Sequence, residues 1–136
     1  ENDLSNMSYD DFIIAYRKII LETVSCLREN SFAAFVVGDI RYGKHGLYRN
    51  FVSHTISAFE DAGAFLYNEA VLFTALGSLP IRTGGQFEAS RKMGKGHQNV
   101  LVFVKGDPKI AAAKCLGGVV DVFGVESVTQ LDDLFV

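Results

Sequence analysis

The sequence predicts an α/β fold whose sheet is mostly parallel and closes on one antiparallel strand. Three mainly apolar runs indicate strands, and the first, at residues 32–38, lacks the polar alternation of a strand with one exposed face, which is typical of a strand that is covered on both faces. A helical pattern separates the first two runs, and such a strand–helix–strand unit predicts a parallel pair joined by a right-handed crossover. No helical pattern separates the second run from the third, so we expect the third strand to run antiparallel to its neighbours.

Two helices are predicted in the first half of the chain. Ser8 followed by Asp11 resembles a capping box, with aspartate in place of the usual glutamate. From Tyr9 to Glu29, apolar residues recur at helical spacing and charged residues fall on the complementary side. A second helix is expected around residues 51–59, with Gly63 at its C′ position.

Three strands and one long loop complete the central part of the chain. The strands are expected at residues 32–38, 64–76 and 99–105. The stretch from Gly77 to Gly96 has five glycines, one proline and little periodicity, which predicts a loop. Loops of this length in a compact domain are usually functional or mobile.

The last part of the chain carries weaker signals. A short Ala-rich helix is expected from Lys109, and a further strand is predicted at residues 119–123. Residues 130–136 are acidic and are expected to be loosely attached. We find no internal repeat and no low-complexity segment.

The composition is that of an ordinary globular protein and excludes wholesale disorder. Of the 136 residues, 49% are hydrophobic and 21% are charged. With a net charge of −3, contact with nucleic acid would need a local basic patch. No apolar run approaches the roughly 20 residues that cross a bilayer, and no leader pattern opens the chain. A soluble cytoplasmic protein without a membrane partner is therefore expected.

The two cysteines indicate neither a metal site nor a disulfide. Cys26 and Cys115 lie far apart in the sequence and form no Cys/His pattern with metal-ligand spacing. We expect two buried thiols in a reducing compartment. His97 has no acidic or thiol neighbour at ligand spacing either, so no metal is expected there.

The Gly-rich stretch gathers basic residues in a sequence that is acidic overall. The basic residues of this stretch and of the position directly after it, set against the single acid Glu88, are Arg82, Arg91, Lys92, Lys95 and His97. One interpretation is a loop that contacts DNA phosphates or recognises the target, ordered when DNA binds. The other is a solvated loop that happens to be basic. For His97 the alternative to a DNA or base contact is a side chain that caps the following strand.

Two pairs of polar residues are candidates for a cleft. Asp39 and Arg41 follow the first strand at its carboxyl end, where open α/β sheets place ligand contacts. The alternative is an ion pair that anchors the loop. Asn68 and Glu69 interrupt the second strand, and polar residues in a buried strand must find partners. Either they face the cleft, or Glu69 pairs with a loop arginine.

Loop aromatics are a further, less specific signal. Tyr42, Tyr48 and Phe87 have rings that could stack on an extruded base, although aromatic side chains in loops more often pack locally. The glycines near them form neither a P-loop nor a GxGxxG pattern, so no nucleotide-phosphate cradle is argued from them.

Residues 35–41, 66–72 and 91–109 together resemble phage and bacterial DNA methylases of the N6-adenine/N4-cytosine group. In the third stretch, Arg91, a spacer and the pair His97-Gln98 lead into the last apolar strand, as in that family. The resemblance implies a partial Rossmann-like class I methyltransferase sheet in which the last strand inserts antiparallel to its neighbours. It divides the chain into the second half of that domain, residues 1–107, and a carboxy-terminal extension, residues 108–136.

The resemblance also implies S-adenosylmethionine as cofactor, DNA as partner and an exocyclic amino group as target, with adenine N6 favoured over cytosine N4. The sequence contains neither the family's Asp-Pro-Pro-Tyr-type tetrapeptide nor its Gly-rich cofactor loop. Asp121 begins a faint likeness to that loop, but Val125 stands where glycine is expected. The catalytic residues are expected upstream of Glu1, in a missing amino-terminal half or a partner chain, and this fragment alone is expected to be inactive.

Other functions remain open on this sequence. A non-catalytic DNA-binding or regulatory subunit would keep this second half of the sheet and lack the active site. A structural or interaction domain on a degenerate methyltransferase fold would show no salt-dependent affinity for DNA. An RNA methyltransferase is a further alternative, because the sheet does not distinguish RNA from DNA.

Overall fold

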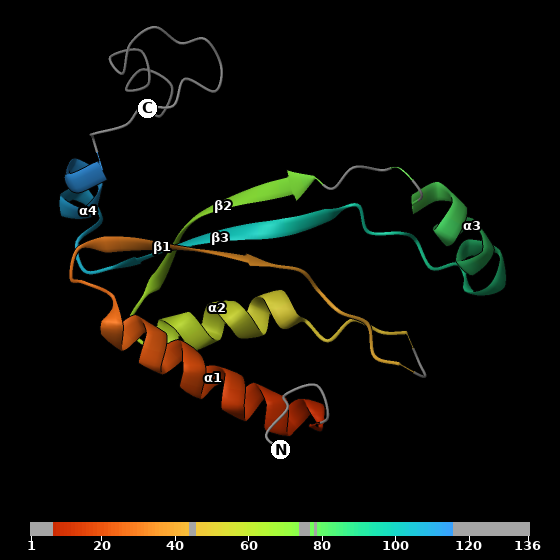
Figure 1. Ribbon diagram of the computed structural model, residues 1–136, viewed down its shortest axis with the longest axis horizontal. Coiled ribbons are helices and arrows are strands. Elements are labelled where there is room, and N and C mark those ends of the chain that lie inside the picture. The colour runs from red at the N-terminus through yellow and green to blue at the C-terminus, as the bar shows by residue number, and fades with distance from the viewer. Residues whose placement is uncertain (1–6, 44–45, 74–76, 78, 116–136) are drawn as a thin grey trace, which may run out of the picture.

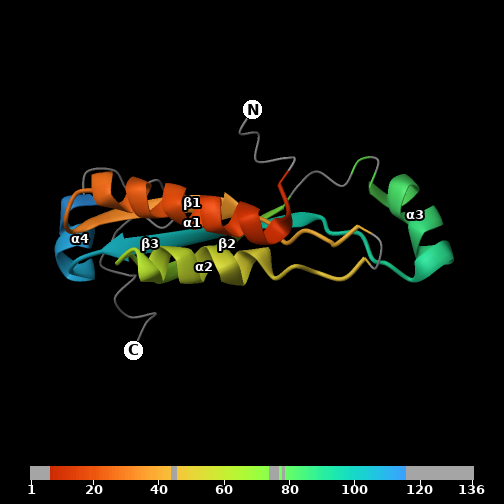
Figure 2. The same cartoon turned by 90° about the horizontal axis from the view of Figure 1, so that it is seen from below.

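The structure is a computed structural model that describes residues 7–43, 46–73, 77 and 79–115 (Figure 1). Its elements in chain order are α1 (Tyr9–Cys26), β1 (Ser31–Val37), α2 (Phe51–Asp61), β2 (Phe65–Phe73), α3 (Leu79–Ser90), β3 (His97–Lys105) and α4 (Pro108–Cys115). Helices α1 and α2 lie on one face of the sheet, and α3 and α4 lie at its opposite ends (Figures 1 and 2). The strand predicted at residues 119–123 and the acidic end fall outside the described residues, and the division at residue 107 stays a prediction.

The sheet is antiparallel, so the prediction of a mostly parallel sheet is wrong. The strand order is β1-β3-β2, and β3 pairs antiparallel with both neighbours. Strands β1 and β2 run in the same direction, but the connection through α2 leaves one strand position between them. The last strand fills that position, as predicted for its direction, and takes the hydrogen bonds that a parallel pair would have made.

The core lies between the sheet and the pair α1–α2. Leu101 and Phe103 of β3 project to this face together with Phe35 and Val37 of β1. The ring of Phe103 stacks on Phe59 of α2, with centroids 4.0 Å apart and planes 8° apart. The residues that alternate with them along β1 project to the opposite face, which no described helix covers along its length. Val36, for example, is 51% exposed.

The first helix begins as predicted and ends earlier. Ser8 accepts a hydrogen bond from the backbone N–H of Asp11 at 3.2 Å and its hydroxyl donates to the Asp11 carboxylate, which closes the first turn much as a capping box does. The helix ends at Cys26, because Leu27 takes an extended backbone conformation (φ −71°, ψ 133°). Gly63 follows α2 at φ 89°, which confirms its predicted C′ position.

A helix occupies much of the segment that the sequence predicts to be a loop. In α3, Pro80 falls in the first turn, where the missing N–H costs nothing, and Gly84 and Gly85 fall in the middle. Residues 84–90 of α3 are exposed, so this part of the helix has no buried face to produce the apolar periodicity that reveals other helices. Arg91 ends the helix in a left-handed conformation (φ 56°), and its N–H donates to the carbonyl of Phe87 at 2.8 Å.

The cysteines are free, as predicted, but they are not buried. Cys26 closes α1 and Cys115 closes α4, and both are exposed. A helix end presents its side chains to solvent unless another element covers it, and no described element covers either cysteine. The expectation of buried thiols is therefore wrong.

Candidate functional site

The segment after β1 folds back on itself as a hairpin. Arg41 and Tyr48 form an antiparallel bridge, and the N–H of Tyr42 donates to the carbonyl of Leu47 at 2.6 Å. The N–H of Arg49 donates to the carbonyl of Ile40 at 3.0 Å, which closes the base of the turn. Residues 39–49 are called the 39–49 hairpin below, and the structure describes all of them except 44 and 45.

Arg41 is fixed within this hairpin. Its guanidinium donates to the carbonyl of Gly46 at 2.8 Å and to the hydroxyl of Tyr48 at 3.0 Å, and its Cζ lies 4.0 Å from the centroid of the Tyr48 ring. Stacking on an aromatic face orients a guanidinium while leaving its charge available. Arg41 therefore presents a positive charge in a defined place rather than on a freely moving side chain.

The stretch between α3 and β3 lies against the hairpin. The side chain of Lys92 lies directly over Gly46, so closely that a Cβ at Gly46 would collide with it. On the other side, Gly94 approaches the side chain of Thr83 in α3 equally closely. The two glycines thus allow residues 91–97, called the 91–97 segment below, to sit between the hairpin and α3.

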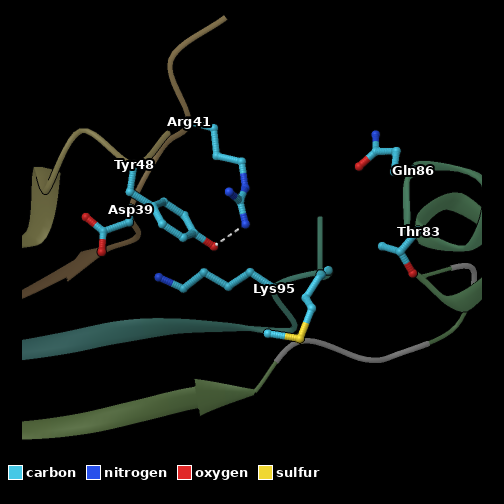
Figure 3. A pocket seen from close by; sticks show the side chains of 8 residues that line it. Asp39, Arg41, Tyr48, Thr83, Gln86 and Lys95 are labelled. Carbon is cyan, nitrogen blue, oxygen red and sulfur yellow. Dashed lines mark hydrogen bonds between the residues drawn. The ribbon is translucent and has the colours of Figure 1, made fainter. Parts of the chain in front are cut away.

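Pockets lie at the end of the sheet where β1 and β2 have their carboxyl ends. The first, of about 400 Å³, lies between the hairpin, α3 and the 91–97 segment (Figure 3). It is lined by Asp39, Arg41, Tyr48, Thr83, Gln86, Met93, Gly94 and Lys95. A second, of about 320 Å³, continues past Lys95 to the first residues of β3, His97 and Gln98. A third lies between the hairpin and the first turn of α1.

Among the described side chains at this end, the basic ones outnumber the acidic ones and form no ion pair. Asp39 accepts a hydrogen bond from the N–H of Val52 at 3.1 Å, which anchors the first turn of α2. Within the described ranges, the ion pair that is found joins Arg17 of α1 to Asp61 of α2 and involves none of the residues of this end. Arg41, Lys92 and Lys95 therefore carry charge that no described carboxylate neutralises.

The structure brings together six of the nine residues that the sequence proposes. The 39–49 hairpin holds Asp39 and Arg41. The 91–97 segment holds Arg91, Lys92, Lys95 and His97. Asp39 accepts a hydrogen bond from the first turn of α2 and forms no ion pair with Arg41, so the structure does not show the ion pair that was considered as the alternative. Arg91 lies over the Phe87 ring, 5.4 Å from its centroid. The roles of all these residues in binding stay predictions.

Three of the proposed residues lie elsewhere or are not described. The side chain of Arg82 falls outside the described part of the structure. Asn68 and Glu69 lie in the middle of β2, and neither lines the three pockets. Glu69 accepts a hydrogen bond from the side-chain amide of Asn99 at 2.6 Å rather than from a loop arginine. A β-bulge between Leu66 and Asn68 shifts the register just before this pair.

The described pockets do not fit S-adenosylmethionine. The cofactor carries a sulfonium and an ammonium against one carboxylate, so a site for it needs acceptors or negative charge. The first two pockets offer Arg41 and Lys95, and the single carboxylate, Asp39, is engaged at the start of α2. Like charges would repel the sulfonium here, so no step through the cofactor is assigned to these residues.

Metal-binding clusters and membrane-spanning helices are both absent from the described ranges. These residues contain no group of three or more His, Cys, Asp or Glu side chains that could hold a metal ion. No helix among them combines the length and the apolar character that crossing a bilayer requires.

Comparison with known proteins gives a likeness of fold. No protein-family model matches the chain, and no curated protein matches its sequence. A solved structure that does match is TTHA0409 from Thermus thermophilus, provisionally assigned as a DNA modification methylase. The match has a TM-score of 0.55 and 16% sequence identity, and it covers 73% of this chain and 38% of that one. The chain therefore has a methyltransferase-like fold and spans well under half the length of its structural neighbour.

Proposed function

We propose that this chain is the part of a DNA methyltransferase that faces the DNA. The enzyme would transfer a methyl group from S-adenosylmethionine to an exocyclic amino group, adenine N6 rather than cytosine N4. The observation that carries the proposal is the convergence of the 39–49 hairpin and the 91–97 segment at one end of a methyltransferase-like sheet. Together they present Arg41, Lys92 and Lys95 without a described carboxylate partner.

The charge and geometry of this end suit a DNA backbone. Most protein–DNA hydrogen bonds go to phosphate and sugar, and they set the position of the protein on the duplex. Lys95 lines both the first and the second pocket, so a strand that followed it would pass from the hairpin to His97 at the start of β3. A target base must leave the stack to reach an active site, and fixed phosphate contacts beside that site hold the distorted strand.

Catalysis in this proposal is mainly positional, and its central groups come from outside the chain. The tetrapeptide that would accept hydrogen bonds from the amine is absent from the sequence, and the pockets do not fit the cofactor. A missing amino-terminal half or a partner chain would supply both. The free edge of β1 supports this, because β1 pairs with β3 alone among the described strands. On α1, Ile14 and Leu21 are 69% and 54% exposed, seven residues apart on one helix face.

A second candidate is a non-catalytic DNA-binding or regulatory subunit. The same absence of tetrapeptide and cofactor loop favours it. Both candidates predict DNA binding by this chain. They differ in methyl transfer once the upstream coding sequence, if one exists, is included in the expressed protein.

The double variant Lys92→Ala/Lys95→Ala is expected to weaken DNA binding by roughly tenfold or more at about 0.1 M salt. Two lost phosphate contacts should also lower the slope of log affinity against log salt by about 1.8. Fluorescence anisotropy with a labelled duplex, repeated over a salt series, measures both. The matched control is Lys18→Ala/Lys109→Ala, which removes the same charge from exposed positions on α1 and α4.

Equal losses in the two double variants would show a diffuse charge effect and would contradict the interface. The enzymatic part of the proposal needs a separate assay with radiolabelled S-adenosylmethionine. We expect no transfer to DNA by this chain alone and transfer by the chain together with its upstream sequence. Transfer by neither, with DNA binding intact, would favour the binding subunit.

A further inference from the structure

A second arginine of the hairpin is held in an unusual environment. The Cζ of Arg49 lies 4.2 Å from the ring centroid of Tyr9 and 3.9 Å from that of Tyr42. Tyr9 belongs to the first turn of α1 and Tyr42 to the hairpin, so the stack joins two separate elements. Stacking of this kind restricts the side chain before any ligand binds.

Tyr9 is itself fixed by its hydroxyl. The oxygen lies 2.9 Å from Nδ1 of His54 in α2 and donates to the carbonyl of Arg49 at 3.3 Å. Burial raises the pKa of the Tyr9 hydroxyl, although the neighbouring Arg49 lowers it, so the phenol stays neutral near pH 7. The stack therefore positions the Arg49 guanidinium without cancelling its charge.

The edge of this guanidinium is free in the described structure. Within the described residues, Arg49 has no carboxylate within ion-pair distance, and its guanidinium donates no hydrogen bond. It lines the third pocket, of about 410 Å³, with Met7, Tyr9, Phe12, Ile40, Arg41, Tyr42 and Gly43. Arg41 lines this pocket and also the first one, so the two pockets adjoin at Arg41.

The lining of the third pocket indicates what it would take. Two guanidinium groups and no carboxylate favour an anion, and guanidinium forks match the oxygens of a phosphate group. The apolar wall of Met7, Phe12 and Ile40 suits the carbon face of a sugar attached to that phosphate. A nucleotide unit of a polymer offers both parts, whereas inorganic phosphate offers the anion alone.

We propose that Arg49, clamped between Tyr9 and Tyr42, binds a backbone phosphate of DNA in the third pocket, as a contact point separate from the 91–97 segment. The inference rests on the proposed DNA-facing role of this end of the sheet. It adds a residue that lines a different pocket from Lys95, joined to the first pocket through Arg41, and so extends the footprint of the strand.

The test is the variant Arg49→Gln, which removes the charge and keeps a flat polar group between the two rings. DNA affinity is expected to fall roughly five- to tenfold at about 0.1 M salt, with a salt slope smaller by about 0.9, the value for one phosphate. Arg49→Lys should keep the salt slope, because it keeps the charge. Arg28→Ala, an exposed arginine before β1 at the opposite end of the sheet, is the control and should bind as the wild type does.

The outcomes separate this inference from the proposed function. If Lys92→Ala/Lys95→Ala weakens binding and Arg49→Gln does not, the Arg49 site is overturned and the interface stands. If the unmodified chain shows no salt-dependent binding, the proposed function fails as well.

Two further measurements distinguish a DNA contact from other roles of Arg49. The response to inorganic phosphate is followed by NMR of the arginine side chains. If Arg49→Gln loses this response and keeps its DNA affinity, the pocket is a free-anion site and the DNA contact is overturned. Thermal unfolding of each variant shows whether Arg49 merely stabilises the hairpin, in which case the melting temperature falls and the salt slope does not.

Discussion

Replacing Phe103 with alanine is expected to lower the free energy of unfolding by about 3–5 kcal/mol, the usual cost of deleting a buried phenylalanine ring. Phe103 is 0% exposed and lies in β3, the central strand, between β1 and β2. Its ring stacks on Phe59 at 4.0 Å, so the deletion removes the closest ring contact between the sheet and α2 and leaves a cavity. Natural domains have only about 5–15 kcal/mol of stability in total, so this loss is a large part of it.

Urea unfolding followed by circular dichroism measures the change from the midpoint and the slope. The matched control is Phe73→Ala, the same substitution at the exposed end of β2, where the side chain is 79% exposed. We expect the control to change stability by no more than about 0.5 kcal/mol. A Phe103→Ala variant within about 1 kcal/mol of the wild type would contradict the position of the core.

The strands and the direction of the last one were predictable from the local sequence, but the absence of a parallel pair between β1 and β2 was not. The apolar runs at residues 32–38 and 99–105 coincide with β1 and β3 to within two residues at either end. Nothing in those runs specifies that β3 lies between β1 and β2, because strand order depends on contacts between distant segments. The apolar, non-alternating β1 predicted cover on both faces, yet Val36 on its outer face is half exposed in the described structure.

The helix α3 and the hairpin escaped prediction for the same physical reason. Both lie at the end of the sheet, away from the core, so neither needs an apolar pattern to hold it. Glycine and proline predict loops because of their backbone preferences, yet Pro80 stands in the first turn of a helix, where proline is tolerated, and Gly84 stands in its middle at a cost of about 1 kcal/mol relative to alanine. A hairpin without alternating apolar residues leaves only its glycines as a signal, and Gly46, at φ 65°, is one of them.

Part of the candidate site was visible in the sequence as composition. Lys92 and Lys95 were found because four Lys/Arg residues and one histidine share a short Gly-rich stretch. Arg49 was missed because its importance depends on three-dimensional neighbours: Tyr9 is 40 residues away, and Tyr42 faces it only through the register of the hairpin. The sequence could have pointed to Arg49 only if the pairing of Arg41 with Tyr48 were already known, because that pairing sets the register of the hairpin.

Lys105 also contacts residues that are far away in the sequence. Removing this contact is the second change for which we expect a large effect on stability. Its Nζ donates to the carbonyl oxygens of Val24 and Leu27, both at 2.9 Å, from the last residue of β3. These carbonyls belong to the end of α1, which has no basic residue in its own last turn. The ammonium therefore both satisfies helix-end acceptors and places a positive charge at the negative end of the helix dipole.

The variant Lys105→Met is expected to lower the free energy of unfolding by about 2–3 kcal/mol, since hydrogen bonds to a charged group contribute about 1.5–3 kcal/mol. Methionine keeps much of the length of the side chain, so the loss reports the ammonium rather than packing. The control is Lys109→Met, which removes a charge from an exposed position on α4, and urea unfolding compares the two. Because the partly buried ammonium is screened less than a surface charge, the difference should persist in about 0.5 M salt. Equal stabilities for the two variants would mean that Lys105 does not hold the end of α1 to the sheet.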